Sequence, residues 1–253
     1  LALDRGELLL SQTPNKLEAI NAEVQINNNQ AEVLSNFFIK NNQATLNGQI
    51  AWEKDLNMNI DLYAKQLPLL FPPQLVMNVS PTINFLLKEK VLTISGILRV
   101  LEGSYNIEKL PQGSIDLSDD VIIINDEGKE VLKNKSNLAI NTNVTINIEK
   151  EFSVLGQGLE SNLFGQLQVT QQQSKPLQLF GNIQSIKGTY QAYGQKLTID
   201  KGELTFNGPL TNPYFNLRAS RHIKAEDIEV GLKITGLADA LDMQLFSTPT
   251  MEA

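Results

Sequence analysis

The residues best suited to covalent chemistry are few in this chain and lie far apart. His222 is the only histidine and stands in the segment SRHIK, close to Ser220, which raises the possibility of a serine–histidine nucleophile. The segment lacks the strand–turn–helix context that exposes such a serine. It also contains Arg221 and Lys224, and we therefore interpret His222 as a surface residue. The chain has no cysteine, which excludes disulfides and thiolate metal sites.

Carboxylates and glycines do not form a site either. The pairs Asp119–Asp120 and Asp126–Glu127 surround the segment VIII but lack the spaced ligand series of a calcium loop, so we interpret them as turn formers. The segment GQGLES (residues 156–161) has Ser161 where a dinucleotide-binding loop needs its third glycine, and it opens a strand pattern rather than a helix. A glycosidase needs two facing carboxylates, whereas those of this chain fall mostly in turns and at polar positions. The sequence therefore predicts no enzyme, no metal site and no cofactor.

Composition narrows the classes of partner. The chain has 253 residues, a formal net charge of −7 and no basic stripe, which argues against nucleic acid and against charge-driven binding to anionic headgroups. Its length suits one large all-β domain or two smaller ones. No apolar run approaches the roughly 20 residues of a membrane-spanning helix, and no signal peptide is visible. Because the chain begins at Leu1 rather than at a methionine, we interpret it as part of a longer protein.

Apolar and polar residues alternate through most of the chain. Between residues 45 and 65 the apolar side chains fall on even numbers, which predicts a hairpin of two strands with its turn near Lys54 and Asp55. The pattern recurs at 138–148, 163–183 and 228–234. Asn and Gln fill many intervening positions, as expected of a solvent-exposed sheet face with few charges. The sequence therefore predicts an all-β fold with little helix.

The turns and breaks are predicted from glycine and proline. DKG (residues 200–202) fits a hairpin turn, and GPLTNP (residues 208–213) holds two prolines that a central strand would not accept. The proline-rich segment 67–81 is expected to be a crossing loop with room for one helical turn. KLEAINAEV (residues 16–24) could open as a short helix, although its end already alternates like a strand.

Two segments resemble each other. GILRVLEGSY (residues 96–105) and GNIQSIKGTY (residues 181–190) share two glycines seven residues apart and a following tyrosine, which predicts two copies of a strand–bend–strand unit. The residues expected at bends and turns are Gly96, Gly103, Gly181, Gly188, Gly202, Gly208, Pro209 and Pro213.

The segment from residue 176 to residue 221, which includes GTYQAYGQKLTIDKGELTFNGP, resembles the C-terminal region of the TamB family. LFSTPTM near the end, and LTISGILRV and LPQGSIDLSDDVIIIND upstream, follow the order of that family. The resemblance runs from about residue 46 to the end. Members of this family are inner-membrane-anchored subunits of the translocation and assembly module and are related to AsmA-like lipid transporters.

The resemblance implies an elongated, curled, mostly antiparallel sheet that forms an open groove with an apolar interior. Residues 46–253 would form this groove, and residues 1–45 a less certain N-terminal β segment. It also implies a periplasmic protein, anchored in the inner membrane of a Gram-negative bacterium outside this chain. Such a protein would carry phospholipid between the two membranes. Its partner would be a TamA-like outer-membrane barrel, contacted through its POTRA repeats.

The face of the sheet and its edges point to different functions. A continuous apolar face with little helix to cover it fits a lipid conduit. Exposed sheet edges instead fit a docking or chaperone module for outer-membrane β-barrel assembly or autotransporter secretion. Alternation alone favours a third reading, a closed β-sandwich scaffold. The residues expected to line a groove are Leu46, Ile50, Trp52, Leu56, Met58, Ile60, Leu62, Leu138, Ile140, Val144, Ile146, Ile148, Leu163, Leu167, Val169, Leu177, Leu179, Ile183, Ile228, Val230, Leu232 and Ile234, with Thr142 as a polar exception.

Overall fold

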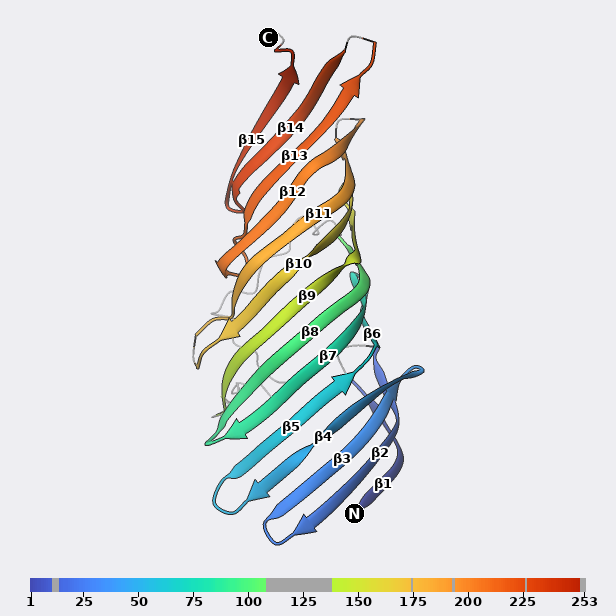
Figure 1. Ribbon diagram of the computed structural model, residues 1–253, viewed down its shortest axis with the longest axis vertical. Helices are drawn as coiled ribbons and strands as arrows, with labels where there is room; N and C mark the ends of the chain where they lie inside the picture. Colours follow the sequence, from blue (N-terminus) through green and yellow to red (C-terminus); the bar gives the residue numbers. More distant parts are fainter. Residues whose placement is uncertain (11–13, 108–137, 174, 193, 226, 251–253) are drawn as a thin grey trace, which may run out of the picture.

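The computed structural model describes residues 1–10, 14–107, 138–173, 175–192, 194–225 and 227–250. These residues form fifteen β-strands in one elongated sheet, and they contain no helix (Figure 1). The strands are β1 (Ala2–Leu9), β2 (Lys16–Asn27), β3 (Gln30–Ile39), β4 (Asn42–Trp52), β5 (Leu56–Ala64), β6 (Leu67–Phe71), β7 (Leu75–Lys88), β8 (Val91–Asn106), β9 (Ala139–Gly156), β10 (Leu159–Gln171), β11 (Gln178–Ala192), β12 (Gln195–Pro209), β13 (Tyr214–Ile223), β14 (Ile228–Leu237) and β15 (Ala240–Thr248).

The strand order follows the sequence with a single detour. Each strand pairs with the next along the chain except that β5 and β6 both pair with β7, one with each half of it. All pairs are antiparallel apart from β8 and β9. The strands β1 and β15 each have one neighbour and stand at opposite ends of the sheet (Figure 1), which therefore does not close into a barrel. The predicted elongated, mostly antiparallel all-β fold is confirmed.

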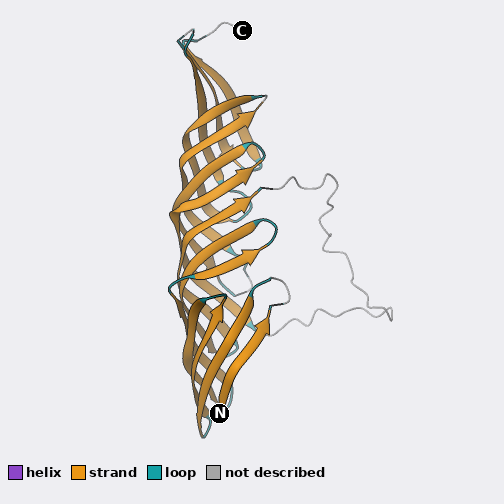
Figure 2. Ribbon diagram, turned by 90° about the vertical axis from the view of Figure 1, so that its right-hand side faces the viewer, coloured by secondary structure: helices purple, strands orange, loops and turns teal. Residues whose placement is uncertain are grey.

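A line of β-bulges bends the middle of the sheet. The register between β8 and β9 shifts after Val100, and the register between β12 and β13 shifts after Ile199. The pairs β7–β8, β9–β10 and β10–β11 shift at a similar depth in their strands. Because a bulge bends its strand and increases the local twist, bulges aligned across neighbouring strands fold the sheet lengthwise. Figure 2 shows the strands curving around the long axis, so that their two ends form two walls.

Glycine is required at places where neighbouring strands approach closely. Gly96 on β8 and Gly181 on β11 begin the two similar segments, and their φ angles are +136° and +125°. A Cβ at Gly96 would lie 2.1 Å from the carbonyl oxygen of Thr82, and one at Gly181 would lie 2.2 Å from that of Gln166. Each glycine lies within one continuous strand, so both similar segments are bent strands with the same local geometry.

The proline-rich segment 67–81 is a hairpin of β6 and β7, so the expectation of a crossing loop was wrong. The cis Pro72–Pro73 peptide lies in its turn. Pro68 lies on β6, whose ladder joins only β7, and Pro81 lies between the stretches of β7 that pair with β6 and with β5. A proline is tolerated at such places because its missing N–H leaves no ladder bond unmade.

Two further expectations are settled by the strand assignments. Residues 200–202 lie inside β12, so the predicted DKG hairpin was wrong: the local irregularity is a bulge between Ile199 and Lys201 in the pairing with β13. A bulge and a tight turn both favour glycine, and the sequence alone did not separate them. Residues 16–24 form part of β2 rather than a short helix, because pairing with β1 and β3 satisfies their backbone groups on both sides.

Gly181→Ala is expected to destabilise the chain more than Gly208→Ala. The φ of Gly208 is +130°, close to that of Gly181, but a Cβ there would meet nothing within 4 Å. Gly208→Ala should therefore lose only the cost of a left-handed backbone, about 1–2 kcal/mol. Gly181→Ala should lose about 1–3 kcal/mol more because its Cβ overlaps the neighbouring strand. Urea unfolding of both variants measures the difference, and equal losses would contradict close strand approach at Gly181.

Candidate functional site

The strand register gathers apolar side chains on one face of the sheet, which we call the apolar face. One row of mutually paired positions crosses every strand from β7 to β15. This row contains no polar side chain and consists of Val79, Val100, Ile148, Gly165, Ile183, Leu204, Phe215, Gly236 and Leu241. Alternation in nine strands is therefore in phase across the sheet.

A second apolar row runs through the N-terminal strands, close to the turns that join β2 to β3, β4 to β5 and β7 to β8. It crosses β2, β3, β4, β5, β7, β8 and β9 and consists of Ile26, Ala31, Ile50, Met58, Leu87, Leu92 and Ile140. The adjacent row toward the middle of the strands contains Ile60, Phe85, Ile94 and Thr142. Only Thr142 is polar among these eleven positions.

The register brings the predicted groove residues of β4, β5, β9, β10, β11 and β14 to this one face. Direct pairs include Leu46 with Leu62, Ile146 with Leu167 and Val169 with Leu179. Leu138 and Leu177 lie just outside the strands, immediately before β9 and β11 respectively. Sequence reasoning missed the apolar positions of β2, β3, β7, β8, β12, β13 and β15. For β7 and β8 the signal was present in the alternating segments 81–87 and 92–100, which the prolines and the similar-segment pattern obscured.

Much of the apolar face is open to solvent in the described chain. Leu56 is 52% exposed and Ile140 is 39% exposed, while Leu245 on the terminal strand β15 is 86% exposed. Other positions are buried, and Leu167 is only 6% exposed. The described residues form one sheet, so no second sheet packs on this face. A closed β-sandwich is therefore not what these residues form.

The apolar face is closed over one region of the N-terminal strands, which we call the closed half. The carboxamide of Asn15, 3% exposed, donates to the carbonyl oxygen of Leu70 at 2.9 Å and accepts from its N–H at 3.0 Å. This pair joins the start of β2 to the free edge of β6, and Leu17 and Ile20 of β2 pack on the core beneath. The core residues of the closed half are Phe37, Ile39, Ala44, Ala64, Leu67, Val79 and Val100.

The opposite face of the sheet, which we call the amide face, carries many carboxamides and hydroxyls, with single exposed apolar residues such as Leu34, Leu86 and Ile97 among them. The Asn84 side chain on β7 donates to Asn59 at 2.7 Å and to Asp61 at 2.8 Å, both on the neighbouring strand β5. Gln168 donates to Asn143 at 2.7 Å and accepts from the Thr145 hydroxyl at 2.8 Å. These cross-strand bonds satisfy neutral polar groups between adjacent strands, so this face is polar without a high density of charge.

A charged cluster on the amide face joins the last four strands. Arg218 on β13 lies 3.1 Å from Glu229 on β14 and 3.5 Å from Asp200 on β12. Its guanidinium lies 4.0 Å from the centre of the Phe246 ring on β15. Hydrogen bonds from Ser220 and then Arg218 lower the pKa of the Glu229 carboxyl below its ordinary value of 4.5.

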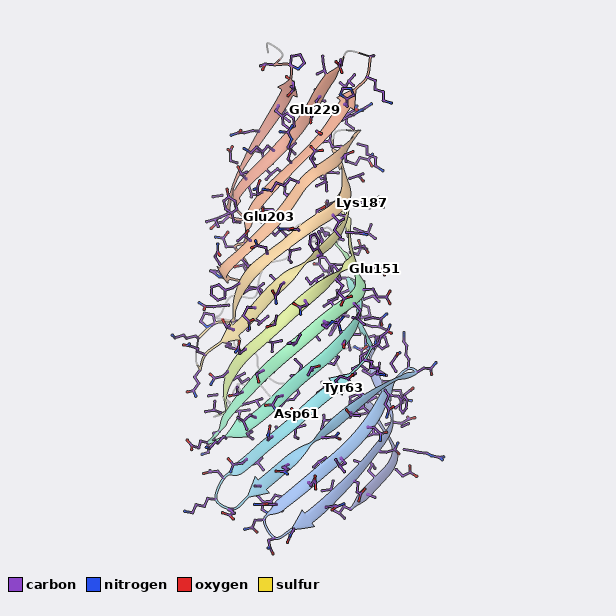
Figure 3. All side chains as sticks on the ribbon, viewed as in Figure 1. Asp61, Tyr63, Glu151, Lys187, Glu203 and Glu229 are labelled. Carbon is purple, nitrogen blue, oxygen red and sulfur yellow. The ribbon has the colours of Figure 1, made fainter. Side chains whose placement is uncertain are left out.

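The candidate catalytic residues do not converge in the described structure. His222 is 54% exposed and lies 3.4 Å from Asp227, whereas Ser220 forms a hydrogen bond with Glu229. Figure 3 shows the labelled carboxylates of Asp61, Glu151, Glu203 and Glu229 well apart along the sheet.

Metal-binding groups are likewise not gathered. In the described residues, no group of three or more His, Asp or Glu side chains could hold a metal ion. The carboxylates Asp119, Asp120, Asp126 and Glu127 lie outside the described residues. No helix in the described part of the chain is long and apolar enough to cross a membrane.

Comparison with known proteins identifies the family of this chain. A family model described as the TamB C-terminal domain matches residues 32–253. The chain belongs to the TamB family. A relative from Haemophilus influenzae, the translocation and assembly module subunit TamB, is 32% identical over 211 residues, which cover 79% of this chain and 16% of that protein. The chain therefore spans a small part of that TamB protein's length, and the resemblance predicted from the sequence is confirmed.

The Asn15 side chain should be essential to the closed half. Asn15→Ala leaves both backbone groups of Leu70 without their partner in a buried place, so we expect a loss of about 1–3 kcal/mol in unfolding free energy. Hydrogen exchange should show faster exchange at the Leu70 amide. Asn41→Ala, in an exposed turn, is the matched control. An unchanged Leu70 exchange rate in Asn15→Ala would show that this pair does not hold β6 to β2.

Proposed function

We propose that this TamB-family chain shields the acyl chains of phospholipid on its apolar face and so forms part of a bridge between the inner and outer membranes. The proposal places the chain in the periplasm of a Gram-negative bacterium, in a protein anchored in the inner membrane. The observation that carries it is the continuous apolar face, which is in phase over nine strands and partly exposed outside the closed half. On monomeric proteins, extended exposed apolar surface marks a site that binds a protein, a membrane or an apolar ligand.

The chemistry of the face supports an apolar cargo. The two apolar rows, and the positions Ile60, Phe85 and Ile94 of the row adjacent to the second one, carry only hydrocarbon side chains, a thioether or glycine. The hydroxyl of Thr142 is the exception. Moving acyl chains along such a surface exchanges one apolar contact for another, so no covalent step is needed. The proposal therefore includes the prediction that the chain is not an enzyme and takes no cofactor.

A second candidate function rests on the edges of the sheet rather than on its face. The strands β1 and β15 each have only one neighbour, so each offers unpaired backbone groups to an added strand. The relative from Haemophilus influenzae is named as a translocation and assembly subunit. An edge could therefore dock a TamA-like outer-membrane barrel through its POTRA repeats, in support of β-barrel assembly or secretion. Both functions are compatible, because one uses a face and the other an edge.

Ile60→Arg is expected to block lipid transfer while the chain stays folded. Ile60 is half-buried on the apolar face, where a guanidinium would place a charge in the path of acyl chains. Pulse-chase labelling in cells measures phospholipid transfer to the outer membrane, and thermal unfolding checks the fold. Asn59→Arg, on the amide face one residue away, should transfer lipid normally. Normal transfer by a folded Ile60→Arg variant would contradict the proposal, as would equal loss in both variants.

Proline on β15 tests the second candidate. Neighbouring residues of an edge strand point their N–H groups alternately to the partner strand and to the open edge. Of Met243→Pro and Gln244→Pro, one should therefore break the ladder with β14 and the other should only obstruct the edge. The variant that keeps its melting temperature should lose binding to purified POTRA repeats and retain lipid transfer. Unchanged POTRA binding by that variant would remove the β15 edge as the docking site.

A further inference from the structure

The N-terminal strands divide the apolar face into two parts with different exposure. The closed half is covered by protein: Ala44, Ala64 and Val79 are each only 1% exposed. Nearer the turns that follow β2, β4 and β7, the same strands carry half-buried or exposed side chains, and we call this part the open half. It consists of Ile26, Ile50, Met58, Ile60, Phe85, Leu87, Leu92, Ile94 and Ile140. The small side chain of Ala31, between Ile26 and Ile50, is buried.

The difference follows from the contacts that close one half and not the other. The Asn15–Leu70 pair and the strand β6 bring Leu17, Ile20 and Leu69 over the closed half. Leu62 packs on the edge of that core. Beyond it, β5 continues toward the turn with no such cover from the described residues, and Leu56 is 52% exposed. Among the residues that the structure describes, the uncovered apolar surface of these strands therefore lies in the open half.

The depth of the open half matches one leaflet of a membrane. From Leu56 beside the turn to Leu62 at the core the strand advances six residues, which is about 20 Å. The hydrocarbon of one leaflet is roughly 15 Å deep, half the apolar thickness of a bilayer. An acyl chain can therefore lie between the turns and the core, with its headgroup at the turns.

The turns that border the open half carry equal numbers of both charges. Three lysines stand beside three carboxylates, although the whole chain has a net charge of −7. These exposed residues are Glu53, Lys54 and Asp55 after β4, and Lys88, Glu89 and Lys90 around the end of β7. A border with adjacent positive and negative groups complements a headgroup that carries both a phosphate and an ammonium group, and it does not complement a purely anionic one.

From these observations we propose that, between β2 and β9, the acyl chains of zwitterionic phospholipid occupy the open half alone. The closed half is a permanent core that anchors the fold and takes no lipid. This inference rests on the proposed function, because it states which part of the apolar face would carry the cargo and which class of headgroup it would take.

Three phenylalanines allow a matched test in the intact protein in its own host. Phe85 lies in the open half, Phe37 in the closed half and Phe38 on the amide face. Replacing each in turn by p-benzoylphenylalanine adds one photoreactive group to an existing aromatic side chain. Because Phe37 is 8% exposed and its variant could fail to fold, Phe152, which packs against the same core, supplies a second closed-half position. Mass spectrometry then identifies any lipid crosslinked at each site.

The expected result is phospholipid at position 85 and none at positions 37, 152 and 38, with phosphatidylethanolamine at least as abundant in the adduct as in the membranes. Phospholipid at 37 or 152 as well as at 85 would overturn the inference and leave the proposed function intact. Enrichment of phosphatidylglycerol would overturn the headgroup assignment. Lipid at none of the positions, or at 38 as readily as at 85, would overturn the proposed function together with the inference.

Discussion

An apolar sheet face in water must be covered, and here the described chain covers only part of it. Hydrophobic burial is the main favourable term in folding, so a sheet of this length normally packs against helices or a second sheet. The described residues provide neither. They bend the sheet upon itself instead, through aligned bulges and through glycines such as Gly96 and Gly181 that let backbones approach. Curvature reduces the exposed apolar area without removing it, and this remainder defines the function proposed for the chain.

The fold depends on keeping the strands of this curved sheet in register. A slip of one residue in any strand would turn its apolar side chains to the amide face. The bulges fix the register because each places one extra residue at a defined position, as at Val100 and Ile199. The closed half adds a second constraint, because the Asn15–Leu70 pair joins two strands that the sheet order separates. The same features that shape the sheet thus hold its apolar rows in line.

Sequence reasoning reached the fold class because a period of two is a local signal. The hairpin of residues 45–65 and the strands around Ile146 and Leu167 follow directly from alternation. Proline and glycine were less reliable, since both serve strands as well as turns: Pro68 and Pro81 lie in ladders with a missing neighbour, and Gly202 lies in a bent strand. The closed half was not predictable at all. It depends on contact between Asn15 and Leu70, fifty-five residues apart, and nothing in the local pattern marks either residue.

Alternation also cannot say whether an apolar side chain faces protein or an external molecule, because both environments select the same residues. Ile60 and Ala64 lie four residues apart on one strand and follow the same pattern, yet Ala64 is 1% exposed whereas Ile60 is only half-buried. What separates them is the cover supplied by β6 and by the start of β2. A groove that binds a cargo along its whole length would need neither β6 nor the start of β2 over Ala64. Their presence is better explained if part of the sheet serves as a fixed core, against which the remaining apolar surface stays open without the N-terminal strands collapsing onto it.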